Sequence, residues 1–121
     1  MALHVNSLTF DAADPAALAA FWATVFEADV TSPNPFVSLV DPVGGPKLMF
    51  ISNGDQKRAK NRCHLDLHAD DIAAVEAEVR RLVAAGATEV ETHEEHGVHW
   101  TTLRDPEGNE LCVGTPLPGH G

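Results

Sequence analysis

The sequence predicts an α+β fold in which two tandem βαβββ modules form a curved, cup-like mixed sheet with helices on its outer face. Three observations predict it: a strand followed by a capped helix occurs twice, an Asp-Pro-x-Gly turn follows each copy, and one strand alternates apolar with ionisable residues. Short strands with a helix on one side make a sheet with one covered face and one open face. Two such sheets side by side are expected to enclose a cup.

The first strand and helix lie near the N-terminus. Residues 3–10 have the composition of a strand, and Asp14 and Pro15 are typical of an N-cap and the first helical position. Apolar residues then recur at the i, i+3, i+4, i+7 spacing of one buried stripe: Leu18, Phe21, Trp22 and Val25. Trp22 is therefore expected in the core.

A second strand and helix follow in the same order. Residues 63–69 have strand character, Asp70 and Asp71 precede a helix, and Gly86 is placed to end it. The apolar stripe of this helix is expected to be Ile72, Val75, Val79 and Leu82.

The two halves can be superimposed on each other. Asp14 and Asp71 are 57 residues apart, and the same offset carries Leu8 onto Leu65. The turns that begin at Asp41 and Asp105 are 64 residues apart, so the second half has seven extra residues. We expect them in the segment rich in His and Glu at 92–99.

Length and charge limit the possible functions. The 121 residues are enough for one domain, 1–121, with module one at about 1–56, module two at about 62–115 and an irregular tail at 116–121. A net charge of −10 argues against nucleic acid as a partner, and no apolar run reaches membrane-spanning length. Two cysteines are too few for a disulfide framework and fit a cytoplasmic protein.

The central strand at 62–69 is the first candidate site element. Its apolar residues belong against the helix, so the alternating polar set is expected to face the cup. That polar set is Arg62, His64, Asp66 and His68. Two residues apart on one strand, His64 and Asp66 are expected to contact a ligand together rather than each other.

The hairpin around the second turn supplies the rest of the candidate site. With an odd loop length, Arg104 lies opposite Glu110 and Thr102 opposite Cys112, and Trp100 shares their face. A large aromatic ring among polar groups is suited to a planar organic ligand, although packing at a module or dimer interface is an equally good account of Trp100. A solvated open face is the alternative for the whole set.

In this order and spacing, the motifs resemble the vicinal oxygen chelate superfamily, the glyoxalase/bleomycin-resistance/dioxygenase fold, and most closely its small glyoxalase-like branch. They are Asp14-Pro15 with Phe21-Trp22, the run Lys60–Leu67, Ala85-Gly86-Ala87, and Asp105–Glu110. The resemblance implies a fold rather than one reaction.

The resemblance also implies four metal-ligand positions on strands that face the cup. In this chain those positions hold Ser7, His64, Leu48 and Cys112, with Glu110 two residues from Cys112. His64 fits a ligand and Cys112 is a possible thiolate. We therefore expect no metal; if one is present, as Zn, Ni, Fe or Mn, its ligands would be His64, Glu110 and Cys112.

Three functions follow from these features. The favoured one is metal-independent binding of a small planar, aromatic or cationic molecule, as in bleomycin-resistance-type sequestration. The second is a metal-dependent lyase, isomerase or dioxygenase with His64 and Glu110 as candidate catalytic residues, and the third is a non-catalytic interaction domain. The expected binding residues are Ser7, Arg62, His64, Asp66, His68, Trp100, Thr102, Arg104, Glu110 and Cys112.

Two further expectations concern assembly and the histidine-rich segment. Chains of this size in the fold commonly pair, so a homodimer is expected. His93, His96 and His99 would share an ion only in a helix, which Gly97 and a hairpin context oppose.

Overall fold

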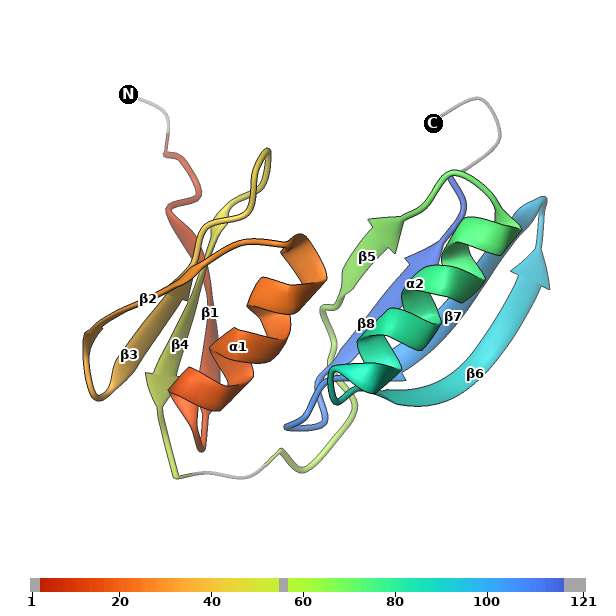
Figure 1. The fold of residues 1–121 in the computed structure, drawn as a ribbon. Helices are drawn as coiled ribbons and strands as arrows, with labels where there is room; N and C mark the ends of the chain where they lie inside the picture. The colour runs from red at the N-terminus through yellow and green to blue at the C-terminus, as the bar shows by residue number, and fades with distance from the viewer. Residues whose placement is uncertain (1–2, 55–56, 117–121) are drawn as a thin grey trace. The chain divides into compact units, whose positions relative to one another are not determined.

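The computed structural model describes residues 3–54 and 57–116. The chain divides into two compact units, Met1–Gln56 and Lys57–Gly121, and each has the order β-α-β-β-β (Figure 1). The predicted α+β class with two tandem modules is confirmed, and each module forms a four-stranded mixed sheet. Of the predicted tail, residues 117–121 lie outside the described residues.

The first unit is built from β1 (Ser7–Ala12), α1 (Pro15–Phe26), β2 (Val30–Asn34), β3 (Val37–Val40) and β4 (Lys47–Ser52). Its sheet has the order β1-β4-β3-β2, with β1 and β4 parallel and the other neighbours antiparallel. The chain passes from β1 to β4 through α1, β2 and β3, which is the long connection that a parallel pair requires.

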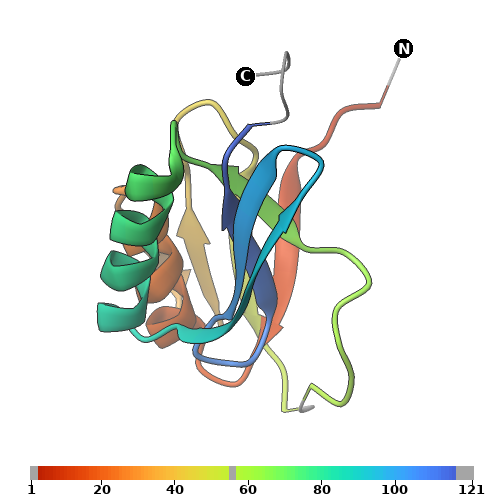
Figure 2. The same ribbon diagram turned by 90° about the vertical axis from the view of Figure 1, so that its right-hand side faces the viewer.

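The second unit repeats this plan with β5 (Leu65–His68), α2 (Ile72–Ala84), β6 (Thr88–Glu95), β7 (Val98–Arg104) and β8 (Glu110–Gly114). Its sheet has the order β5-β8-β7-β6, again with one parallel pair, β5 and β8. In both views α2 lies along one face of this sheet and leaves the opposite face uncovered by a helix of the unit (Figures 1 and 2).

Both helices begin where the sequence predicts. The Asp14 carboxylate accepts the backbone N–H of Ala17 at 3.1 Å, and the Asp71 carboxylate accepts that of Ala74 at 2.8 Å. These bonds satisfy donors that the first helical turn leaves unpaired. Gly86, with φ of 122°, follows the end of α2, as the sequence predicts.

An aromatic cluster fills the core of the first unit. Trp22 is 1% exposed and its ring lies 5.4, 5.6 and 6.1 Å from the rings of Phe10, Phe21 and Phe26. Phe10 also stacks on Phe50 of β4, with ring centroids 5.1 Å apart. The expectation that Trp22 is a core residue is confirmed.

The apolar stripe of α2 differs from its prediction at one position. Val75, Val79 and Leu82 are buried against the sheet, whereas Ile72 is 43% exposed. Ile72 is the first helical residue and borders a shallow depression beside the β6–β7 hairpin. The end of the helix therefore leaves it partly uncovered.

The extra residues of the second half lengthen a hairpin. Strands β6 and β7 have eight and seven residues, whereas β2 and β3 have five and four. The turn between β6 and β7 is His96-Gly97, with φ of 53° and 81°. Two residues with positive φ match the two-residue turns that suit the twist of a hairpin. The segment is therefore a β-hairpin, and His93, His96 and His99 do not have the helical spacing that a shared ion would need.

Candidate functional site

The open face of the second sheet carries most of the predicted site residues. Register places Arg104 opposite Glu110 and Thr102 opposite Cys112, as predicted, and Asp66 pairs with Cys112 on its other side. Leu111 and Val113 are buried while Cys112 is half-buried, which is the alternation of a strand with one face on a helix.

A groove of about 820 Å³ lies over this face. Eight of the predicted residues line it: His64, Asp66, His68, Trp100, Thr102, Arg104, Glu110 and Cys112. Arg62 is exposed and outside the lining, and Ser7 belongs to the first unit. Four carboxylates, from Asp66, Glu91, Glu95 and Glu110, face two basic side chains, from Lys60 and Arg104.

Strand β6 contributes groove residues that sequence reasoning missed. Glu91, His93 and Glu95 line the groove at alternate positions. The His96-Gly97 turn pairs Glu95 with Val98, and the unbroken register from there pairs His93 with Trp100 and Glu91 with Thr102. The position of this turn decides which face of 91–95 points into the groove, so placing the turn from the sequence is the signal that would have found these residues.

His64, Asp66 and Cys112 form a cluster at the β5–β8 pair. One potential ligand atom from each lies within 4.8 Å of the others, and His64 Nδ1 is 2.9 Å from Asp66 Oδ1. The expectation that His64 and Asp66 would not contact each other is wrong. His64 precedes the first residue of β5, so its backbone is not held in the ladder and its ring turns toward Asp66.

Cys112 is not an activated thiol in this setting. Burial raises the pKa of the Cys112 thiol, and the nearby Asp66 carboxylate raises it further, although Thr102 Oγ1 lies 3.4 Å from the sulfur and opposes the shift. A nucleophilic cysteine needs a lowered pKa. The neutral thiol therefore lines the groove as a weakly polar group. A metal ion would be bound by the thiolate, after the thiol has lost its proton.

Glu110 is held by the segment that leads into β5. It is 6% exposed, Lys57 Nζ lies 3.2 Å from Oε1, and the backbone N–H of Asn61 donates to Oε2 at 3.1 Å. Burial alone would raise the pKa of Glu110, but the Asn61 amide and the Lys57 ammonium outweigh it and lower that pKa. Both oxygens are engaged, so Glu110 is a structural anchor in this geometry, whereas the metal set expected from the sequence included it.

Trp100 and His93 form the aromatic part of the groove. Their ring centroids are 5.0 Å apart with an angle of 25° between the planes. His93 Nε2 lies 3.1 Å from Glu91 Oε1 on the same strand. The groove therefore presents a stacked pair of flat rings beside a carboxylate, an arrangement suited to planar molecules that carry an N–H group.

Gly114 leaves the space in the sheet that Trp100 occupies. The two residues pair across β7 and β8, and a Cβ added to Gly114 would lie 2.7 Å from Trp100 Cβ and 3.0 Å from the His99 carbonyl oxygen. Only a residue without a side chain leaves room for the tryptophan at this point of the sheet.

We expect Gly114→Ala to lower stability by about 1–3 kcal/mol, because the backbone of β7 must move to relieve the overlap. The same change should shift the indole N–H signal of Trp100 in an NMR spectrum. Gly45→Ala is the control, since its Cβ would meet only Pro42 at 3.7 Å or more. An unchanged Trp100 signal in folded Gly114→Ala would contradict this role.

The equivalent positions of the first unit offer no ligand set of the same kind. Ser7 pairs with Lys47 and its hydroxyl lies 3.4 Å from that of Thr9. Leu48 is 1% exposed and faces the core, so the sequence match placed it one residue out of phase; Met49, which pairs with Thr9, corresponds to Cys112.

The donor chemistry of the cluster fits a borderline-soft divalent ion. Imidazole, carboxylate and thiolate all bind zinc, and three protein ligands are what a catalytic zinc site uses. His64, Asp66 and Cys112 would hold the ion, which would then polarise a bound oxygen atom as a Lewis acid. The ligand set expected from the sequence contained Glu110, whereas the cluster in the structure contains Asp66 instead.

Comparison with known proteins places the chain in a family. The model of the glyoxalase-like domain family matches residues 7–114. A search of curated proteins finds no significant match.

Solved structures share the fold. A glyoxalase/bleomycin resistance protein/dioxygenase family enzyme from Burkholderia phytofirmans PsJN superimposes with a TM-score of 0.82 at 20% identity, over 93% of this chain and 98% of that one. A lactoylglutathione lyase from Agrobacterium tumefaciens gives 0.66 at 23% identity, over 90% of each chain. Oxidase ChaP-H2 gives 0.72 at 20% identity, over 97% of each chain.

These proteins include a lyase and an oxidase, so the shared architecture does not select one reaction. The resemblance seen in the sequence motifs is confirmed by the domain match along most of the chain. The chain belongs to the glyoxalase-like domain family of the vicinal oxygen chelate superfamily.

Proposed function

We propose that this protein binds a small planar organic cation in the groove over β5–β8, without using a metal. The observation that carries the proposal is the indole of Trp100, which lines the groove together with four carboxylates. An aromatic face attracts a cation through its quadrupole, and nearby carboxylates add to that attraction.

Charge in and around the groove favours a cation over an anion. The whole chain carries −10, and the lining has two more acidic than basic side chains. Glu110 is neutralised by Lys57, which leaves Asp66, Glu91 and Glu95 to face a ligand. Half of the chain's basic residues lie in the segment 57–62, and of these four Lys60 alone lines the groove.

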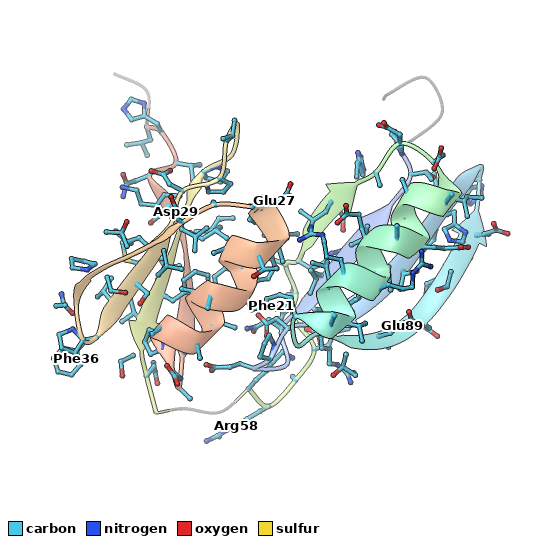
Figure 3. All side chains as sticks on the ribbon, viewed as in Figure 1. Phe21, Glu27, Asp29, Phe36, Arg58 and Glu89 are labelled. Atoms are coloured by element: carbon cyan, nitrogen blue, oxygen red, sulfur yellow. The ribbon has the colours of Figure 1, made fainter. Side chains whose placement is uncertain are left out.

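Binding of 9-aminoacridine, a planar cation, tests the proposal by isothermal titration calorimetry. We expect one ligand per groove and no binding of the planar anion 9-anthracenecarboxylate. Trp100→Ala should bind the cation about fivefold to thirtyfold more weakly, because one stacked face is worth about 1–2 kcal/mol. Phe36→Ala is the control, since Phe36 projects from the β2–β3 turn of the first unit (Figure 3). Equal affinity for the cation in Trp100→Ala would contradict the proposal.

The cluster of His64, Asp66 and Cys112 supports a second candidate, a metal-dependent lyase, isomerase or dioxygenase. These three side chains all belong to the second unit. Metal content of the purified protein, measured by plasma emission after dialysis, separates the two candidates. One ion per chain that is lost in both His64→Ala and Cys112→Ala supports the second; no ion after incubation with Zn²⁺ excludes it.

A further inference from the structure

The imidazole of His93 is itself a planar N–H heterocycle. It stacks on Trp100 and contacts the carboxylate of Glu91. The imidazole stacks on the indole with ring centroids 5.0 Å apart, and its Nε2 lies 3.1 Å from Glu91 Oε1. Both residues line the groove, and the side chains of His93 and Glu91 are 34% and 64% exposed. The contacts that a planar cation would make are therefore already made by a side chain of the protein.

From this geometry, and resting on the proposed function, we propose that His93 is an internal occupant that the ligand displaces. The ligand class follows from what His93 does: a flat nitrogen heterocycle or amidine that stacks on Trp100 and donates an N–H to Glu91. His93 is then a specificity-determining residue, because only a ligand that makes both contacts better than imidazole can replace it.

The position of His93 in the sheet makes displacement feasible. Within the described part of the chain, β6 is one of the two edge strands of its sheet and is hydrogen-bonded to β7 alone. The β6–β7 hairpin ends in a two-residue turn, so its tip is held by one ladder. A rotation of the His93 side chain breaks one stacking contact and one contact with the Glu91 carboxylate, and it leaves the buried face of the sheet in place.

Rescue by free imidazole tests this role. In His93→Ala the place of the imidazole ring is vacant. We expect added imidazole to bind there with a Kd of about 1 mM, a reasonable affinity for so small a molecule, and to shift the indole N–H NMR signal of Trp100. Trp100→Phe assigns that signal. The wild-type signal should not move at the same concentration. The double variant His93→Ala/Glu91→Gln should bind imidazole about tenfold more weakly, because the charge-assisted hydrogen bond is lost.

His99→Ala is the matched control. His99 also pairs with a carboxylate, Glu94 Oε1 at 3.0 Å, on the same hairpin, but it neighbours Trp100 in β7 and so points to the opposite face of the sheet. Imidazole should leave the Trp100 signal of this variant unchanged. An unchanged signal in folded His93→Ala, or an equal shift in wild type and His99→Ala, would overturn the inference.

The affinity for 9-aminoacridine separates this inference from the proposed function. If His93 must be displaced, His93→Ala should bind the cation about threefold to tenfold more tightly than wild type does. Equal affinities would overturn the role of His93 and leave the proposed function standing. Absence of cation binding by the wild type would refute the proposed function, whereas the imidazole experiment would still report on whether His93 fills a site.

Discussion

Glu110→Gln is expected to lower the free energy of unfolding at neutral pH by about 2–4 kcal/mol. Glutamine keeps the shape of the side chain but removes the charge that Lys57 Nζ meets at 3.2 Å, and it replaces one of two acceptor oxygens. Removing one partner of a buried ion pair leaves the other without compensation. Lys57 is 23% exposed and retains some contact with water, which keeps the expected loss below that of a fully buried pair.

The pH dependence of stability provides an independent measurement. The pKa of Glu110 is lower in the folded protein because its hydrogen bonds outweigh its burial. The carboxylate therefore adds stability at pH values above the ordinary glutamate pKa, and this contribution is lost as the pH falls through the lower folded value. Urea unfolding from pH 7 to pH 3 should show a shallower decline for Glu110→Gln than for wild type.

A matched variant distinguishes the anchor from a general charge effect. Glu89→Gln removes a carboxylate of β6 that is exposed (Figure 3). We expect a loss below about 0.5 kcal/mol for this exposed position. If both variants lose the same stability and keep the same pH profile, the anchoring role of Glu110 is wrong.

Trp22→Ala should produce the largest loss of stability in the first unit, about 3–5 kcal/mol. The indole is 1% exposed and contacts the rings of Phe10, Phe21 and Phe26, so its removal leaves a cavity in the centre of the aromatic cluster. The midpoint of urea unfolding is the measurement. For an m-value of about 2 kcal/mol/M, a loss of this size moves the midpoint by about 2 M.

Two variants bracket the expected effect of this cavity. Trp22→Phe retains an aromatic ring and should lose roughly half as much stability. Phe36→Ala removes a side chain that is 66% exposed and should change the midpoint little. A Trp22→Ala variant as stable as Phe36→Ala would mean that the cluster does not hold the unit together.

Local signals in the sequence predicted the helices and most of the sheet. Asp14 and Asp71 are caps because a side-chain oxygen two or three residues before an unpaired N–H satisfies it wherever the helix packs. The repeat of strand, capped helix and turn likewise predicted two modules, since each element depends on neighbours within about a dozen residues. Even the pairing of Arg104 with Glu110 followed from the length of one turn.

The errors have physical causes outside the local pattern. Leu48 was taken as the equivalent of Cys112, but the turn after Asp41 is followed by a strand one residue out of phase, and a shift by one residue exchanges the two faces of a strand. Ile72 follows the helical stripe, yet its exposure depends on where the helix end lies over the sheet.

The amino-acid sequence by itself determined the fold of this protein, its acidic character and the strand faces that carry Asp66, Trp100 and Cys112. Only the tertiary structure decided how those side chains are used. Glu110 is an anchor because Lys57, distant in sequence, reaches it, and His93 covers Trp100 because the two rings, paired across β6 and β7, turn toward each other and stack. Caps and turns act over a few residues, whereas an ion pair across the unit and the stacking of two side chains depend on how the whole chain packs.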